Sequence, residues 1–151
     1  MEINEKIIEC AKEIFSTMVM MEISVNGDSM TKSLPLTESI TGVIGLAGTH
    51  KGVLAIHIPN KVAMAITSSF LGMDVDEINA DVEDAIGELA NMLGGNVKSI
   101  LSENGKDINL SLPSTITGQQ YDFQPTKDAE RIIIPFQCDA GKFAIDLQLE
   151  K

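Results

Sequence analysis

Three polar side chains stand at helical spacing within residues 81–100: Asp84, Glu88 and Asn91, with Gly95 one turn further on. At about 100° per residue, these four positions share one side of a helix. A carboxylate can pair with a cation, and an amide can accept a hydrogen bond from water while its NH2 group donates elsewhere. This set, called here the polar row, therefore offers groups that could bind a charged partner and orient a water molecule.

The opposite side of the same segment is apolar. Its hydrophobic residues recur at steps of three and four positions: Val82, Ile86, Leu89, Leu93, Val97 and Ile100. This period predicts a helix over roughly residues 80–102 that buries one face in the core and presents the polar row on the other.

Glycines interrupt this segment at Gly87, Gly94 and Gly95. Each costs about 1 kcal/mol relative to alanine in an exposed helix interior. Because Gly95 lies in the polar row and Gly87 flanks Asn91, the missing side chains would let another surface approach the helix closely. The alternative is that Gly94 and Gly95 pack against a neighbouring helix while the rest of the row is merely solvated.

The remaining residues offer little other chemistry. His50 falls in a predicted turn and His57 alternates within a predicted strand, so no histidine-paired metal site is expected. Cys10 and Cys138 are far apart and form no CxxC motif, which favours buried free thiols over a disulfide or a thiolate metal site. No GxSxG motif of a serine hydrolase occurs.

Composition limits the partners and the compartment. Asp and Glu number 22 against 11 Lys and Arg, for a formal net charge of -11. This charge argues against nucleic acid and anionic membranes, because both bind clustered cations. Residues 1–19 carry charges throughout, so they contain no signal-peptide apolar stretch, and no run of about 18 apolar residues occurs. We therefore expect one cytoplasmic domain over residues 1–151.

The pattern of apolar residues and turn signals predicts an α+β fold, with long helices packed on a mainly antiparallel sheet of hairpins. Helices are expected over three segments: 3–20, 61–71 and 80–102. Asn60 is the expected N-cap of the second helix, and Gly72 its end. Two hairpins and two short strands are expected: 39–48 with 52–58, 131–138 with 142–149, 107–112 and 115–118. Pro135 predicts an edge strand or a bulge.

The run from Asp84 through Glu88 and Asn91, continued as Met-Leu-Gly-Gly to Asn96, resembles the phosphatase signature of the CheC, CheX and FliY family of chemotaxis proteins. In that family an acidic or Ser residue precedes Glu by four positions, Asn follows Glu by three, and Pro follows some two dozen residues later. Pro113 sits one residue closer than that spacing. Only Glu88 has an Asn three positions on, so the short chain resembles the single-motif CheX-like members, and a CheC-like fold is implied.

The resemblance implies a phosphatase that acts on the aspartyl phosphate of a CheY-like response regulator. It implies that Asn91 orients the attacking water and that Glu88 pairs with the regulator's active-site lysine. Asp84, Gly87 and Gly95 would then support docking. Mg²⁺ is expected on the phosphorylated partner, so this chain would need no cofactor or metal of its own.

CheX-like relatives form homodimers through their sheets, so the resemblance also implies a homodimer, to which the runs 131–138 and 142–149 could contribute an edge. Two other function classes stay open. One is a module that binds receivers without hydrolysis, and the other is a structural dimerisation domain. Intact Glu88 and Asn91 favour the enzyme, and their exposure beside a glycine-floored groove would count against the dimerisation domain.

Overall fold

The computed structural model describes residues 3–29, 35–102, 107–121 and 129–150, and it confirms the expected α+β fold. The strands of these residues are β1 Ser24–Val25, β2 Leu36–Gly48, β3 Gly52–Pro59, β4 Ile108–Leu110, β5 Ser114–Tyr121, β6 Ala129–Cys138 and β7 Gly141–Glu150. They form one sheet in the order β1-β6-β7-β3-β2-β4, with β5 also paired to β2, and all of these pairs are antiparallel.

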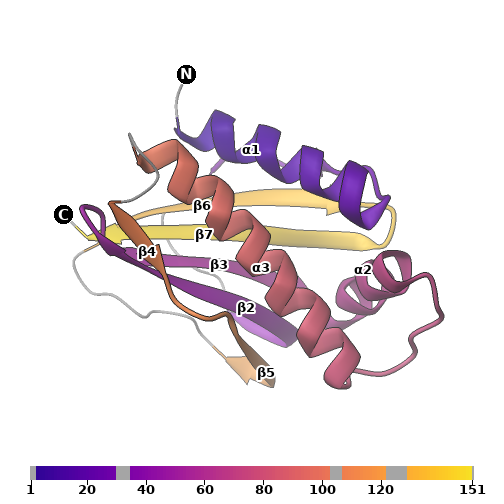
Figure 1. Ribbon diagram of the computed structural model, residues 1–151. Helices are drawn as coiled ribbons and strands as arrows, with labels where there is room; N and C mark the ends of the chain where they lie inside the picture. The colour runs from indigo at the N-terminus through magenta and orange to yellow at the C-terminus, as the bar shows by residue number, and fades with distance from the viewer. Residues whose placement is uncertain (1–2, 30–34, 103–106, 122–128, 151) are drawn as a thin grey trace.

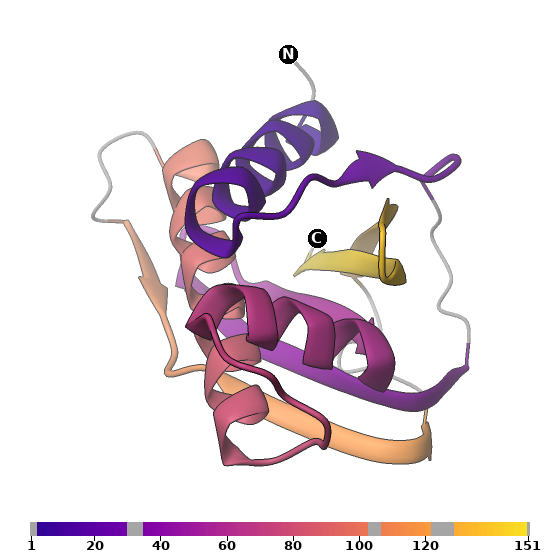
Figure 2. The same cartoon turned by 90° about the vertical axis from the view of Figure 1, so that its right-hand side faces the viewer.

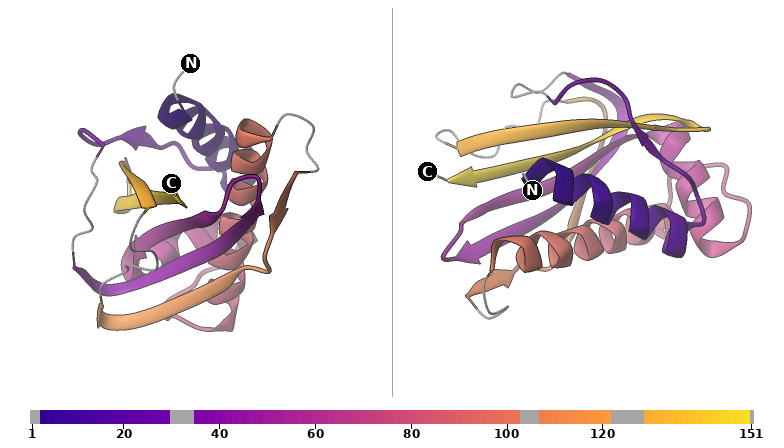
Figure 3. Two further views of the ribbon diagram at one scale, coloured as in Figure 1. Left: turned by 90° about the vertical axis from the view of Figure 1, so that its left-hand side faces the viewer. Right: turned by 90° about the horizontal axis from the view of Figure 1, so that it is seen from above.

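The helices cover one face of this sheet (Figures 1 and 2). They are α1 Ile3–Ile14, the π-helix η1 Phe15–Val19, α2 Asn60–Leu71 and α3 Ala80–Leu101. Seen from above, α1 and α3 run side by side, and α2 lies near the end of the molecule where α3 begins (Figure 3). The expected first helix, 3–20, is thus an α-helix to Ile14 that widens into one π turn and closes at Met20.

The core lies between the helices and the sheet. Alternate residues of β2, β3 and β7 face the helices and are buried: Ile40, Ile44, Leu54, Ile56, Ile58, Phe143, Ile145 and Leu147. On α3, five of the six predicted apolar positions are buried, and Ile100 is half-buried. Burying one such side chain contributes about 1.5–3 kcal/mol. This apolar face fixes the rotation of α3, so the polar row points away from the sheet.

Two glycines bring α3 close to β2. A Cβ at Gly42 would lie 2.9 Å from the carbonyl oxygen of Ile86, and one at Gly94 would lie 2.9 Å from Cγ2 of Ile44. Gly94 therefore packs against a strand, and a Cβ at Gly95 would meet no atom within 4 Å. The alternative in which both glycines pack against a neighbouring helix is wrong.

The ends of the helices show which capping residues the local sequence identifies correctly. Asn79 caps α3, since its side chain accepts a hydrogen bond from the Val82 N–H at 3.2 Å. Gly72 ends α2 with a φ of 70°, as expected. The expected N-cap role of Asn60 is wrong, because Asn60 is already the first helical residue and Pro59 precedes it without a side-chain cap.

Both expected hairpins are present, but only one of the two runs expected to supply an edge, 131–138, lies near the edge of the sheet. β7 lies between β3 and β6, so the run 142–149 provides no free edge. Within the described ranges, β1 pairs with β6 at Phe136 and Gln137, and the Asn26 N–H donates to the Pro135 carbonyl at 2.8 Å, so the rest of β6 lies at the edge of the sheet. An edge is the position expected for a strand that contains Pro135.

At the other edge, β4 and β5 follow each other along β2. β4 pairs with residues 46–48 and β5 with residues 36–43. The short connection between them, Ser111 to Pro113, places Pro113 beside α3.

Candidate functional site

The α3 polar row is accessible, as its spacing predicts. Asp84 and Glu88 are exposed, and Asn91 and Gly95 are half-buried. Within the ranges described, the side chains of Asp84, Glu88 and Asn91 form no hydrogen bond and no ion pair. Their hydrogen-bonding capacity is therefore free for a partner.

A hollow of about 390 Å³ opens beside Glu88. Its lining residues come from the first half of α3, from the β4–β5 connection and from the start of β5: Glu83, Asp84, Gly87, Glu88, Pro113 and Thr115. Gly87 is buried and forms its floor, since a Cβ there would lie 3.9 Å from Pro113 Cβ and 3.9 Å from Thr115 Cγ2. The chain therefore brings Pro113 to the motif helix despite its shorter spacing, and we call this feature the Gly87–Pro113 hollow.

Not every predicted residue lines this hollow. Asn91 and Gly95 lie one and two turns further along α3, outside the lining set. Glu83 and Thr115 belong to it, although sequence reasoning missed both. Thr115 could have been found because it lies two residues after Pro113, and residues two apart in a strand face the same side.

The charge of the site is negative. Asp81, Glu83, Asp84 and Glu88 all lie in the first half of α3, and none of the described residues that line the hollow is basic. Acidic residues in the first turn stabilise the positive end of the helix dipole. Glu88 lies beyond that turn, so its carboxylate is suited to a cationic group on a partner.

A second set of polar residues lies on the sheet face without helices. Tyr121, Thr41, His57, Asp146 and Arg131 come from β5, β2, β3, β7 and β6, and we call them the sheet network. Thr41 Oγ1 lies 2.8 Å from the Tyr121 hydroxyl and 2.9 Å from His57 Nδ1. His57 Nε2 lies 2.9 Å from Asp146 Oδ2, and the Arg131 guanidinium donates to both Asp146 oxygens at 3.1 and 2.6 Å.

One hydrogen bond of this network has a fixed direction. The Asp146 carboxylate only accepts, so His57 Nε2 carries a proton and donates to Asp146 Oδ2. Burial raises the pKa of Asp146, but hydrogen bonds and charges from His57 and Arg131 outweigh burial and hold this pKa below its usual value. Burial also raises the pKa of Tyr121.

The sheet network has the hydroxyl–imidazole–carboxylate order of a catalytic triad, but it cannot act as one. Thr41 and Asp146 have no exposed surface, and His57 is 6% exposed. A nucleophilic hydroxyl must reach its substrate. The sheet network therefore stabilises the sheet, because it pairs the charges that are buried there.

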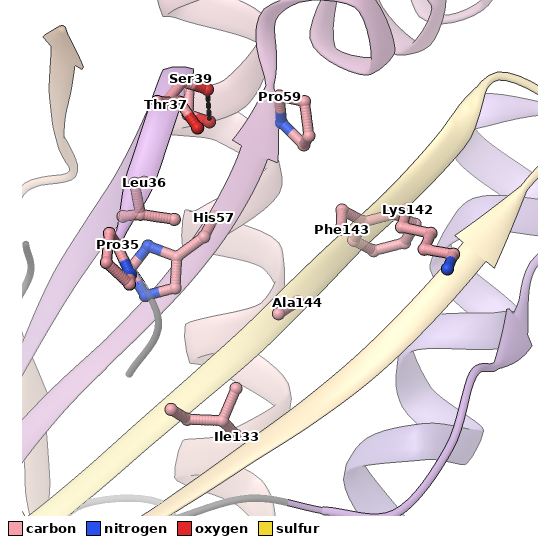
Figure 4. A pocket seen from close by; sticks show the side chains of 10 residues that line it. All are labelled: Pro35, Leu36, Thr37, Ser39, His57, Pro59, Ile133, Lys142, Phe143 and Ala144. Atoms are coloured by element: carbon pink, nitrogen blue, oxygen red, sulfur yellow. Dashed lines mark hydrogen bonds between the residues drawn. The ribbon is translucent and has the colours of Figure 1, made fainter. Parts of the chain in front are cut away.

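A cavity of about 270 Å³ lies beside His57 (Figure 4). Its lining is mostly apolar: Pro35, Leu36, Thr37, Ser39, His57, Pro59, Ile133, Lys142, Phe143 and Ala144. Ser39 uses its hydroxyl locally, donating to the Thr37 carbonyl at 2.8 Å. None of the residues predicted for function lines this cavity.

Other candidate chemistry finds no support in the described residues. Among them, no group of three or more His, Cys, Asp or Glu side chains is placed to hold a metal ion. Cys10 and Cys138 are free and half-buried rather than buried, and burial and the nearby Glu13 and Glu9 raise the pKa of Cys10. None of the described helices is both long and apolar enough to cross a membrane.

Known proteins resemble this chain over most of its length. The family model described as chemotaxis phosphatase CheX matches residues 40–137. The protein named CheY-P phosphatase CheX of Thermotoga maritima is 25% identical over 108 residues, which are 71% of this chain and 70% of that protein.

Solved structures share the fold. The chemotaxis protein CheX of Desulfovibrio desulfuricans is 27% identical, covers 99% of this chain with 100% of its own, and superposes with a TM-score of 0.86. A chain from the CheX-CheY-BeF3-Mg complex of Borrelia burgdorferi is 20% identical, with 99% of each chain covered and a TM-score of 0.82. At that identity the likeness to the Borrelia chain shows the fold alone.

Proposed function

Because this chain belongs to the CheX family of chemotaxis phosphatases, we propose that it hydrolyses the aspartyl phosphate of a CheY-like receiver domain. The observation that carries this proposal is the placement of Glu88 and Asn91. They stand three residues apart on one face of α3, free of partners in the part of the chain described. Glu88 lines the Gly87–Pro113 hollow, and Asn91 lies one turn further along the helix.

The relatives support this partner. The Thermotoga protein is named a CheY-P phosphatase, and the Borrelia CheX was solved with CheY, BeF3 and magnesium. BeF3 is a tetrahedral stand-in for a phosphoryl group. A receiver that carries a phosphoryl group is therefore the substrate class that we assign to this chain.

The proposed hydrolysis depends mainly on the positioning of a water molecule. An acyl phosphate is already reactive, so the missing element is a water held in line with the phosphorus atom, and positioning contributes several kcal/mol. Asn91 would accept a hydrogen bond from that water through Oδ1 and donate through its NH2 group. Its half-buried position limits its motion and leaves it accessible.

Glu88 would set the register of the helix on the receiver. Its carboxylate is exposed and would pair with the receiver's active-site lysine in a charge-assisted contact. The i, i+3 spacing places Glu88 and Asn91 on the same side, so one helix delivers both. Asp84 would support docking one turn upstream, and Gly87 and Gly95 would leave room for the receiver surface.

We assign Mg²⁺ to the phosphorylated receiver, where its charge offsets that of the phosphoryl group. The role of this chain is then to add an amide and a carboxylate to a site whose metal and nucleophile belong to the partner.

We also propose that the chain forms a homodimer, as its relatives are expected to do. Among the described residues, no strand pairs with the first half of β6 on the side away from β7, and such a strand edge favours pairing with a second chain. Sedimentation velocity at micromolar concentration tests this, and a single species with the mass of one chain would contradict it.

The decisive experiment mixes the protein with phosphorylated CheY-type receivers and Mg²⁺ and follows loss of the phosphoryl group. Wild type is compared with Asn91→Ala, and the control is Asn109→Ala, which alters an exposed asparagine on β4. Circular dichroism checks that all three are folded. We expect acceleration by wild type and Asn109→Ala and its loss in Asn91→Ala.

Acceleration that survives Asn91→Ala would leave the activity but refute the role of Asn91. No acceleration over the receiver's own decay, across several receivers, would refute the phosphatase and favour a module that only binds receivers. A purely structural dimerisation domain is disfavoured by Glu88, which is exposed and lines a hollow floored by Gly87, whereas Asn91 is half-buried and lies one turn beyond this hollow.

A further inference from the structure

One apolar side chain beside the hollow is explained neither by the core nor by the proposed chemistry. Leu112 is 88% exposed, more than any other large hydrophobic residue in the described ranges. Single exposed apolar residues are common on protein surfaces, so exposure alone assigns no role. The backbone around Leu112 and its place next to the site are what distinguish it.

The backbone at Leu112 is fixed from both sides. The Ser111 N–H donates to the Gly45 carbonyl at 3.0 Å, and the Gly45 N–H donates to Ser111 Oγ at 2.8 Å. The Ser111 hydroxyl also donates to the Leu112 carbonyl at 3.0 Å. Pro113 follows and restricts Leu112 to an extended backbone. Little backbone entropy is therefore lost when the Leu112 side chain is buried against a partner.

Leu112 also adjoins the site directly. The next residue, Pro113, lines the hollow together with Glu88, and its Cβ lies 3.9 Å from the position a Gly87 Cβ would take. A stable interface covers about 800 Å² on each partner, which is far more than two side chains. A receiver that covers Glu88 therefore extends over its immediate surroundings, and Leu112 is exposed one residue from the lining residue Pro113.

We propose that Leu112 is an apolar anchor that inserts against an apolar patch on the receiver, beside the receiver's phosphorylation site. This inference rests on the proposed function. The chain carries a net charge of -11, so its long-range field repels a phosphorylated acidic partner. An apolar contact supplies affinity that does not depend on that field.

The test separates binding from chemistry. Steady-state kcat and KM are measured with the phosphorylated receiver, and Kd is measured with the receiver carrying BeF3 and Mg²⁺. The proteins compared are wild type, Leu112→Ala, the conservative Leu112→Met, and the control Met18→Ala, which alters a 52% exposed side chain on η1. Melting curves and sedimentation velocity check folding and oligomeric state.

We expect Leu112→Ala to raise KM and Kd about tenfold and to leave kcat unchanged, because the contact serves binding and not the reacting atoms. Leu112→Met and Met18→Ala should stay within about twofold of wild type. Asn91→Ala should show the opposite result, with kcat lowered and with KM and Kd close to those of wild type.

Three outcomes would overturn the anchor. If Leu112→Ala has the same KM and Kd as wild type, the anchor role of Leu112 is refuted, but the proposed phosphatase activity is not affected. A fall in kcat alone would place Leu112 in the chemistry, and a changed oligomeric state without changed Kd would place it between copies of this chain. If the wild-type protein neither binds the receiver nor accelerates loss of its phosphoryl group, both the anchor role and the phosphatase activity are refuted.

Discussion

Two sets of polar side chains lie on opposite sides of the sheet, and they differ in how they are paired. In the sheet network, Asp146 has no exposed surface and accepts hydrogen bonds from His57 Nε2 and from Nε and Nη2 of Arg131. In the α3 polar row, Glu88 and Asn91 contact no polar partner among the described residues.

The difference shows that residue type alone does not identify a functional site. The hydroxyl, imidazole and carboxylate of the sheet network would look catalytic by type, but buried charges must be paired to be tolerated, and pairing consumes their hydrogen bonds. The row on α3 is less reactive by type, but its groups are accessible and free. Accessibility together with unused hydrogen-bonding capacity therefore marks the candidate site.

The largest effect that we expect comes from breaking the sheet network. Asp146→Ala removes a fully buried carboxylate that accepts hydrogen bonds from His57 and Arg131, which should cost about 3–5 kcal/mol of unfolding free energy. Urea unfolding measures it, with Asp139→Ala in the exposed hairpin turn as control. Phosphatase activity per folded molecule should be retained, and its specific loss would show that the network is functional.

The second-largest effect that we expect comes from removing a carboxylate of the α3 polar row. Glu88→Ala should lower kcat/KM for the phosphorylated receiver about 100-fold, or about 2.7 kcal/mol, because a charge-assisted contact to the receiver is lost. Its melting temperature should not fall, since the side chain is exposed and unpaired within the described ranges. Glu77→Ala, also exposed, is the control, and an equal loss in that variant would indicate a general charge effect.

Adjacent glycines of α3 give a matched pair of smaller effects. Gly94→Ala should destabilise the fold by about 1–3 kcal/mol, since its Cβ would lie 2.9 Å from Ile44. Gly95→Ala should instead stabilise it by up to about 1 kcal/mol, because no atom lies within 4 Å and alanine favours the helix. Equal melting temperatures for the two variants would contradict the close packing of α3 on β2.

The pH dependence of stability reports on Asp146. Because its pKa is lower in the folded state, the unfolded chain binds more protons near pH 4. The contribution of Asp146 is therefore fully present above its unfolded pKa, about 3.9, and is lost as the pH falls through the lower folded-state pKa. Urea midpoints of wild type and Asp146→Asn should converge on acidification, and a constant gap would refute this role.

The smallest effect is that of salt on the proposed reaction. A chain of charge -11 should approach a phosphorylated acidic receiver faster when repulsion is screened. We expect kcat/KM to rise a few-fold as ionic strength increases from about 0.01 to about 0.15 M, over which the Debye length falls from about 30 to about 8 Å. A steep decrease would show that the docking face is not the acidic one assumed here.

The sequence alone predicted the features that depend on local spacing. The 3.6-residue period identified α3, its buried side from Val82 to Val97, and the exposed side of Asp84 and Glu88. Alternating apolar residues identified both hairpins. The roles of Glu88 and Asn91 came from the family's motif and stay predictions, because the structure shows their accessibility and not their action.

Only the tertiary structure decided the contacts between distant residues. His57, Arg131 and Asp146 meet because three strands pair in one register, and Pro113 meets Gly87 because β5 follows β4 along β2. The expected cap at Asn60 failed because the helix begins one residue earlier, directly after Pro59. A period along the chain fixes which side of an element is apolar, whereas strand register depends on packing between segments far apart in sequence.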